Sequence, residues 1–191
     1  MQLVEPITDV KKLQEMALYL YNKNKRDYIM FEMGINLGLR VSDYLGKTVG
    51  FFREACNKGY IELKQQKTKK PVRVYISEQL KKIMLEYMED KADHNYMFTS
   101  QKASQGEQPI GREQSWRILN KAADAVGITE NIGCHSMRKT FGYWHYQRNH
   151  DIRLLMEIFN HSSEEVTLRY IGITNEEMKK SMNSMDLGIL F

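Results

Sequence analysis

Apolar residues recur along most of the chain at helical spacing, every three or four positions. The first run covers residues 10–23, with Thr8 or Asp9 as its N-cap. The second covers residues 27–37 and is apolar on nearly every side, which predicts a buried helix. Gly38 follows it as the expected helix stop. The pattern therefore predicts a core built from helices.

The middle of the chain instead alternates apolar and polar residues, which is the period of a half-buried strand. This alternation predicts strands over Tyr60–Gln65 and Val72–Ile76, joined through a lysine-rich turn into an antiparallel hairpin at about residues 60–76. We also expect a short strand over Thr48–Phe52 and a single turn of helix around Ser42–Leu45. The predicted sheet is therefore small.

Helical spacing then returns, with a capping residue before most of the runs. Four predicted helices cover residues 78–90 after Ser77, 112–126 before Gly127, the 133–140 stretch to about 148, and 152–159 after Asp151. Two more are opened by capping boxes: Ser162 with Glu165 for a run carrying Val166, Leu168 and Tyr170, and Thr174 with Glu177 for a helix over 176–185.

Trp116 and Leu119 are expected on the inner face of the helix over 112–126. Residues 91–111 are irregular apart from a short element at 96–98, and 101–108 are polar and expected to be mobile. The expected fold is mainly α with a small antiparallel β-sheet (α+β), in a single domain over residues 1–191.

Composition narrows the class of protein. The chain has 191 residues, 42% apolar and 27% charged, as in a soluble globular domain with a sizeable core. No apolar run is long enough to span a membrane, and the N-terminus lacks a signal-peptide pattern. Cys56 and Cys134 therefore indicate free thiols in a cytoplasmic protein, and the five histidines show no zinc-site spacing.

The net charge of +4 permits nucleic-acid binding without requiring it. Basic residues gather at the predicted hairpin, at Lys64, Lys67, Lys69, Lys70 and Arg73. Such a run is often only a solvated edge that prevents aggregation, and this alternative stays open for Lys69 and Lys70.

The stretch from Gly133 to Thr140 lies at the first turn of a predicted helix. His135 and Arg138 are three positions apart and share one side of it. Because a helix N-terminus favours anions, an imidazole and a guanidinium there would form a phosphate cradle. Taken alone, however, the pair favours a core histidine beside a solvated arginine.

Other positions supply matching chemistry. Arg40 directly follows a buried helix, although it could simply pair with Asp43 at the surface. Together with Lys67 and His161, the two arginines and His135 can surround one phosphodiester. Tyr170 can then act as a nucleophile, its alternative being a core tyrosine. Since no acidic metal cluster is evident, we expect neither a metal nor another cofactor.

In order and spacing, from about residue 8 to residue 180, these residues resemble the tyrosine recombinases, the phage integrase family. Each box alone is weak, but five in register are specific. The boxes are Gly38–Asp43 (first arginine), Gln66–Thr68 (hairpin lysine), His135–Arg138 (H-x-x-R), Asn160–Ser163 (second histidine) and Leu168–Tyr170 (nucleophile). The resemblance implies the catalytic-domain fold of that family.

The resemblance also implies a role for each residue. Tyr170 would attack phosphorus to give a 3′-phosphotyrosine, and Lys67 would protonate the leaving 5′ oxygen. Asp43 would support Arg40 or His135, and His135 is also a candidate base. The scissile phosphate would be bound by Arg40, Arg138, His135 and His161. Contacts to other DNA phosphates would come from Lys69, Lys70, Arg73, Arg112 and Arg117.

The implied function is site-specific recombination of double-stranded DNA, of the integrase or invertase type. The enzyme would act as a tetramer on DNA in the cytoplasm, at the nucleoid, with or without accessory DNA-bending proteins. A type IB topoisomerase-like enzyme that relaxes DNA and a non-catalytic DNA-binding regulator on the same fold are the alternatives. The regulator has no need of a tyrosine nucleophile.

Three features depart from the family pattern. Asn160 stands where glycine is usual, and residues 46–52 lack the usual acidic residue. The family's N-terminal core-binding domain is absent, so we expect an excised catalytic domain or a small single-domain member. The apolar tail at about 186–191 is expected to pack on a protein surface, in trans on DNA, with docking in cis left open for the free protein.

Overall fold

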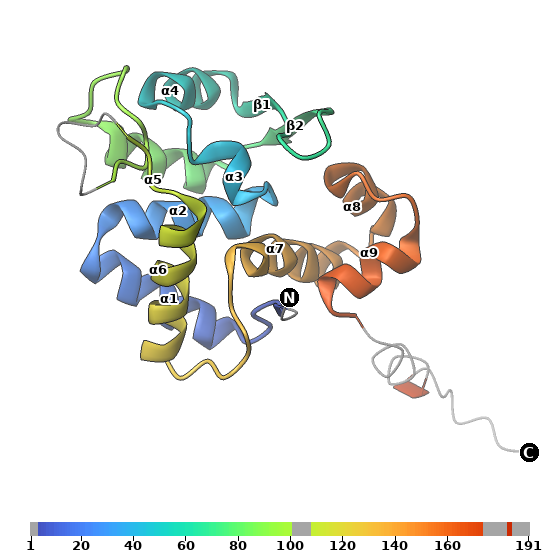
Figure 1. Cartoon of the computed structure of the whole chain (residues 1–191). Helices are drawn as coiled ribbons and strands as arrows, with labels where there is room; N and C mark the ends of the chain where they lie inside the picture. Colours follow the sequence, from blue (N-terminus) through green and yellow to red (C-terminus); the bar gives the residue numbers. More distant parts are fainter. Residues whose placement is uncertain (1–3, 101–107, 174–182, 185–191) are drawn as a thin grey trace, which may run out of the picture.

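The computed structural model describes residues 4–100, 108–173 and 183–184 (Figure 1). Its elements, in chain order, are α1 (Val10–Lys23), α2 (Lys25–Leu37), α3 (Val41–Tyr44), α4 (Val49–Lys58), β1 (Tyr60–Lys64), β2 (Pro71–Tyr75), α5 (Glu78–Met88), α6 (Arg112–Ala125), α7 (Cys134–Asn149), α8 (Ile152–Phe159) and α9 (Glu164–Ile171). The expected α+β class, mainly helical with a small antiparallel sheet, is confirmed.

Helix α2 is the centre of the core and contacts α1, α5, α6 and α7. Its side chains Met30, Phe31 and Met33 are fully buried, as its apolar sequence predicted. It begins two residues earlier than predicted because the Asn24 side chain accepts a hydrogen bond from Arg26 N. Gly38 ends it in the left-handed conformation, with φ of 63°. This stop brings Arg40 immediately after a rigid helix.

The hairpin forms as predicted. Strands β1 and β2 pair antiparallel, with Tyr60 opposite Tyr75 and Leu63 opposite Val72. Alternate residues of both strands are buried, so one face of the hairpin packs on the core. The basic turn lies beside the C-terminal helices, because α8 contacts β2 (Figure 1).

The predicted strand over Thr48–Phe52 is wrong, since most of this segment belongs to helix α4. Thr48 caps that helix by accepting a hydrogen bond from Phe51 N at 3.3 Å. The buried residues Val49, Phe52 and Cys56 follow helical spacing once the following residues are included. Only Thr48 keeps strand character, in a single bridge to Tyr96.

Two further predictions need correction. Ser163, rather than Ser162, caps α9 by accepting a hydrogen bond from Val166 N at 3.2 Å. Trp116 is 47% exposed, because α6 packs on the core through Ser115, Leu119 and the alanines at 122 and 123, and Trp116 lies one position off that face.

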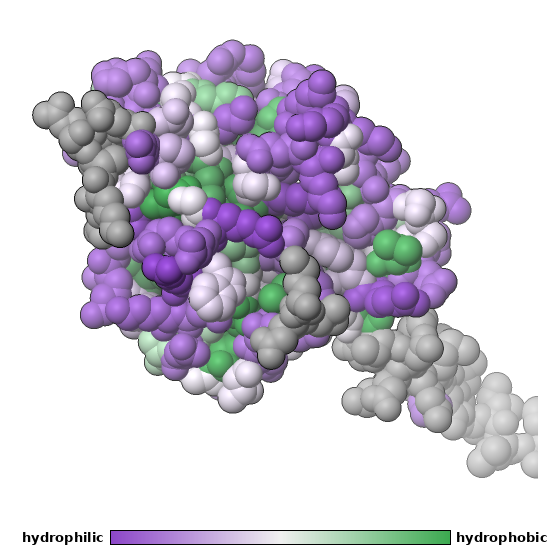
Figure 2. Space-filling view, in the orientation of Figure 1, coloured by the Kyte–Doolittle hydropathy of each residue, from purple (hydrophilic) through white to green (hydrophobic). Residues whose placement is uncertain are grey.

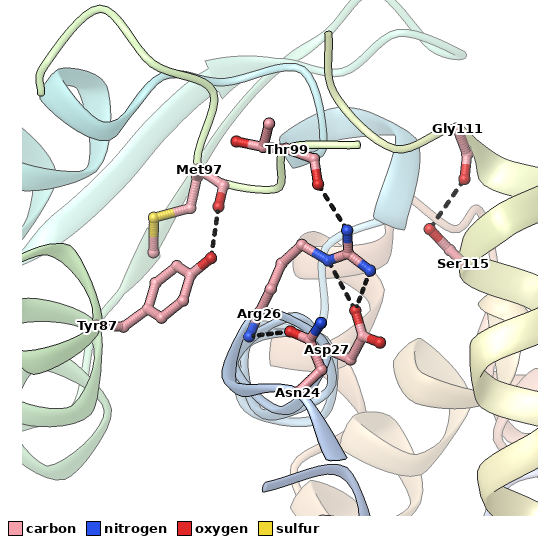
Figure 3. Close-up of polar contacts among 8 residues, drawn as sticks. All are labelled: Asn24, Arg26, Asp27, Tyr87, Met97, Thr99, Gly111 and Ser115. Carbon is pink, nitrogen blue, oxygen red and sulfur yellow. Dashed lines mark hydrogen bonds and ion pairs between the residues drawn. The ribbon is translucent and has the colours of Figure 1, made fainter. Parts of the chain in front are cut away.

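The loop after α5 is held by polar contacts to the start of α2 and to α5 itself (Figure 3). Arg26 pairs with Asp27 and donates to the Thr99 carbonyl at 2.6 Å, while Tyr87 donates to the Met97 carbonyl at 3.1 Å. The backbone at Met97 and Thr99 is therefore tied to α5 and α2.

Some expectations concern residues outside the described ranges. Residues 101–107 of the segment expected to be mobile, most of the helix expected at 176–185 and the tail at 186–191 fall there. Within the described ranges, no helix combines the length and apolar character needed to cross a membrane.

Helices α8 and α9 form a small second core against α7. Its buried side chains are Leu155, Phe159, Ile171 and Ile173. Gly142 of α7 makes this contact possible, because a Cβ there would lie 2.5 Å from Ile171 and 2.8 Å from Phe159. The close approach positions the residues between Phe159 and Ile171 beside the first turns of α7.

Candidate active site

The first arginine box directs two side chains towards the hairpin turn. Arg40 is the N-cap of α3, and its Nη1 donates to Gln65 Oε1 at 2.9 Å. Asp43 is 2% exposed, and its Oδ1 accepts from the backbone N–H of Gln66 at 2.8 Å. The carboxylate that was expected to support Arg40 or His135 therefore holds the hairpin. The alternative of a surface Arg40–Asp43 pair does not describe this arrangement.

Arg138 is not the solvated arginine that its motif alone favoured. It lies in the first turns of α7 and is 1% exposed. Its Nη1 donates to the Gly38 carbonyl at 2.5 Å, and its guanidinium carbon lies 4.3 Å from the centre of the Phe159 ring. Burial lowers the pKa of Arg138 to about 10, with the nearby Arg40 adding to the shift and Tyr170 opposing it. The guanidinium is thus held in place by its contacts, while burial destabilises its charged form.

His135 lies one turn before Arg138, at the N-terminus of α7. Burial lowers its pKa, and the positive charges of Arg112, Arg40, Arg138 and Lys67 lower it further. The imidazole is therefore neutral at pH 7 in the free protein. Four cations acting on one imidazole also mark a concentrated positive field.

His161 follows Asn160, which has a left-handed backbone with φ of 54°. Asparagine tolerates this conformation better than most residues, so the replacement of the usual glycine leaves the loop intact. Thr167 donates its hydroxyl to the Ser163 carbonyl at 3.0 Å, so His161 Nδ1, 3.2 Å from Thr167 Oγ1, must be the donor of that bond. This tautomer leaves Nε2 available to a ligand.

Tyr170 lies in the last turn of α9 and is mostly buried. Its ring makes edge contacts with His161, at 5.0 Å between centroids, and with Phe159, at 5.3 Å. Burial raises the pKa of Tyr170, while the positive charges of Arg138 and Arg40 oppose the rise. The phenol is therefore protonated at neutral pH but lies close to two guanidinium groups.

A groove of about 1090 Å³ opens over this arrangement. Lys67, His135 and Tyr170 line it from three separate elements. Figure 2 shows that the face of Figure 1 is largely hydrophilic, with smaller hydrophobic patches between the polar residues. The fold thus brings a lysine, a histidine and the tyrosine to one open surface, with Arg40 and Arg138 close to His135 and Tyr170.

Three buried polar atoms of this region lack a protein partner. In the described part of the chain, the buried side-chain atoms without a hydrogen bond are Asp43 Oδ2, Gln65 Nε2, Arg138 Nη2 and His145 Nδ1. Leaving a buried donor unpaired costs about 1–3 kcal/mol. The free protein therefore keeps two buried donors, Gln65 Nε2 and Arg138 Nη2, without a hydrogen-bond partner at this site.

The expected DNA-contacting cations fall into two groups. Arg112 lines the groove, and Lys69 and Lys70 are exposed in the hairpin turn. Arg73 pairs with Glu62 at 3.0 Å and Arg117 with Glu113 at 2.5 Å, all on exposed surface. The last two arginines therefore already have carboxylate partners.

Two residues were missed by the sequence analysis. Gln65 is fully buried. The sequence could have indicated it, because it follows Ile61 and Leu63 at the alternate positions that face the core although its side chain is polar. Lys139 is 6% exposed and lines the groove, with its Nζ 5.7 Å from the centre of the Tyr170 ring. Its only sequence signal was its position next to Arg138. Among the described residues, no group of three His, Cys, Asp or Glu side chains is placed to hold a metal ion.

The chain matches the phage integrase family over residues 7–177. A probable integrase/recombinase, YoeC of Bacillus subtilis, is 46% identical over 92% of this chain and 93% of its own length. A tyrosine recombinase of Pseudothermotoga lettingae and XerA of Pyrococcus furiosus are each 26% identical. These two matches cover 93% and 94% of this chain but only 59% and 60% of the length of the relatives.

Solved structures show the same fold. A crystal structure of XerA recombinase superposes with a TM-score of 0.76 at 17% identity, covering 97% of this chain and 67% of that one. XerH in a post-cleavage complex with its difH substrate gives 0.71 at 15% identity, covering 96% of this chain and 54% of that one. The chain therefore belongs to the phage integrase family and is a recombinase of the tyrosine type.

Proposed function

We propose that this domain cuts and rejoins double-stranded DNA at a specific site through a covalent 3′-phosphotyrosine on Tyr170. The observation that carries the proposal is the placement of the phenol against His161 and close to Arg138, beside donors that lack a protein partner. The names and titles of the related recombinases, several of them in complex with DNA, support DNA as the partner.

In the cleavage step, Tyr170 Oη attacks the scissile phosphorus and the bond from phosphorus to the 5′ oxygen breaks. The phenolic proton goes to His135, which is neutral because burial and neighbouring cations lower its pKa. Lys67 donates a proton to the leaving 5′ oxygen. The products are a 3′-phosphotyrosine and a free 5′ hydroxyl, which balances atoms and charge.

Arg40 and Arg138 stabilise the charge that develops on the non-bridging oxygens in the transition state. Because His161 Nδ1 donates to Thr167, the hydrogen bond from His161 Nε2 to the same phosphate is made by the doubly protonated imidazolium form. Rejoining reverses these steps with a new 5′ hydroxyl as the nucleophile. Because the phosphotyrosine keeps the bond energy, the reaction as proposed uses neither ATP nor a metal.

The assembly is part of the proposal. Recombination of two duplexes cuts and rejoins four strands in total, so we propose a tetramer on DNA that supplies one tyrosine for each strand, with or without accessory DNA-bending proteins. We place the reaction at the nucleoid. Lys69, Lys70 and Arg112 provide contacts to DNA phosphates in this arrangement, and Arg73 and Arg117 do so after exchanging their carboxylate partners.

The test is a nicked DNA substrate that traps the covalent adduct, resolved on a denaturing gel in the presence of EDTA. Wild type is expected to form an adduct at a 3′ phosphate, mapped to Tyr170. Tyr170→Phe should bind DNA but form no adduct, whereas the matched control Tyr146→Phe should react normally. An adduct that persists in Tyr170→Phe, or one that requires magnesium, would contradict the proposal. Relaxation of plasmids without a specific site would indicate a topoisomerase instead.

A further inference from the structure

Gln65 is a buried amide on which three separate segments meet. Its Oε1 accepts from Arg40 Nη1 at 2.9 Å and from Thr68 Oγ1 at 2.6 Å, with Asn160 Nδ2 at 3.5 Å. Because arginine can only donate, the atom that faces it must be the amide oxygen. The side chain is 0% exposed, so these bonds form away from bulk water.

Each of the three donors is next to a proposed active-site group or is one itself. Arg40 would bind the phosphate directly. Thr68 directly follows Lys67 in the hairpin turn, and Asn160 directly precedes His161. One oxygen atom therefore ties together the first arginine, the lysine turn and the second histidine.

The backbone around Gln65 strengthens this link. Its N–H donates to the Lys70 carbonyl at 2.9 Å, and its carbonyl accepts from Lys69 N at 2.9 Å, so the turn that carries Lys67 closes on Gln65. The N–H of Gln66 donates to the buried carboxylate of Asp43 at 2.8 Å. A two-stranded hairpin is only marginally stable by itself, so these anchors determine where its turn lies.

From these contacts we propose that Gln65 is a positioning residue for the recombination reaction. Its Oε1 orients Arg40 and holds the turn bearing Lys67 at the phosphate, which rests on the proposed function of both residues. The amide is a poor choice for stability alone, because its Nε2 is buried without a partner and an apolar side chain would avoid that cost. Precise placement of catalytic groups can offset such a cost, since a shift of about 1 Å can reduce a rate about 100-fold.

Three variants separate the contacts. Gln65→Met keeps the length of the side chain and removes the acceptor. Thr68→Val keeps the branched shape and removes the hydroxyl, which donates to Gln65 and accepts a longer bond from Lys70 N at 3.4 Å within the same turn. Asn160→Gly keeps a left-handed backbone and removes only the third contact. Each is compared with wild type on an ordinary nicked substrate and on one with a bridging sulfur at the 5′ position, whose leaving group needs no proton.

On the ordinary substrate, Gln65→Met should lower the cleavage rate about 10- to 100-fold. Its affinity for DNA should change by less than about 3-fold, because the phosphate-binding groups remain. The sulfur substrate should restore Thr68→Val fully, since only Lys67 is displaced there. It should restore Gln65→Met only in part, because Arg40 stays misaligned. Asn160→Gly should show the smallest defect, in line with its long contact.

Cleavage by Gln65→Met at the wild-type rate would overturn the proposal. So would a loss that follows the loss of thermal stability and is the same on both substrates. If Gln65→Met does not fold, the test rests on Thr68→Val. A cleavage defect in Thr68→Val that the sulfur substrate does not correct would then overturn the proposal. Failure of the wild type to form any adduct would instead refute the proposed function.

Discussion

Arg138→Met tests whether the buried guanidinium serves the reaction rather than the fold. The side chain is 1% exposed, donates to the Gly38 carbonyl at 2.5 Å and lies over the Phe159 ring. Methionine fills a similar volume without the charge. Replacing a buried charged group with an apolar one of similar size is often neutral or stabilising.

The pKa of Arg138 provides the magnitude. Burial lowers it from its ordinary value to about 10. At about 1.4 kcal/mol per pKa unit, the folded state disfavours the cation by roughly 3 kcal/mol. Because the folded-state pKa is the lower one, the unfolded state binds the proton more tightly, and this cost applies at every pH below about 10.

Two losses oppose that gain. The hydrogen bond to the Gly38 carbonyl contributes about 1 kcal/mol, and the contact with the Phe159 ring about 1 kcal/mol. The free energy of unfolding of Arg138→Met should therefore equal that of wild type or exceed it by about 1 kcal/mol. For a chain of this length, 1 kcal/mol corresponds to a Tm increase of about 2–4 °C.

The assay pairs thermal unfolding with adduct formation on a nicked substrate. Arg138→Met should keep its Tm but lose cleavage by at least about 100-fold, as expected when one donor to a transition-state oxyanion is removed. Phe159→Ala is the matched control for packing in the same place and should lose about 3–5 kcal/mol of stability. Destabilisation of Arg138→Met by more than about 2 kcal/mol would show that the guanidinium supports the fold. Normal cleavage would remove it from the site.

Three more predictions address neighbouring groups. Lys67→Ala should slow cleavage of an ordinary substrate and recover with a 5′-bridging sulfur, whereas Lys70→Ala should change only DNA affinity; equal losses on both substrates would make Lys67 a simple DNA contact. NMR titration should place the pKa of His135 below 6.5, and Arg112→Gln should raise it; because the unfolded state then takes up the proton first, stability should fall as the pH falls from about 7 to 5. Gly142→Ala should destabilise the packing of α7 on α8 and α9 and reduce adduct formation, with calorimetry and the gel assay as readouts; unchanged values for both would contradict the proposed close contact.

Local sequence determined the elements whose signals lie within a few residues. Asp9, Ser77 and Asp151 cap their helices as predicted, each by accepting a hydrogen bond from a backbone N–H two or three positions later. The alternation of the hairpin and the left-handed Gly38 belong to the same class. The spacing of the boxes was also sufficient to indicate the family, because chain order is preserved whatever the packing.

Segment 48–52 shows where local reading failed. Five residues with an apolar bias fit a strand or a helix equally well, and the decision depended on burying Val49, Phe52 and Cys56 together. The predicted burial of Trp116 was wrong for a related reason. Its place relative to the buried face of α6 depends on how that helix is rotated against its neighbours.

Only the tertiary structure decided how the polar groups of the site are shared. Arg138 donates to the carbonyl of Gly38, which lies 100 residues away in the sequence. Gln65 accepts from Arg40 and Asn160, which are separated from it by 25 and 95 positions. The partner of the Asp43 carboxylate, a backbone N–H of the hairpin rather than an arginine, is decided by packing in the same way. Capping and periodicity are encoded over a single turn of chain, whereas the partners of a buried polar side chain depend on which distant segments the packed core brings beside it.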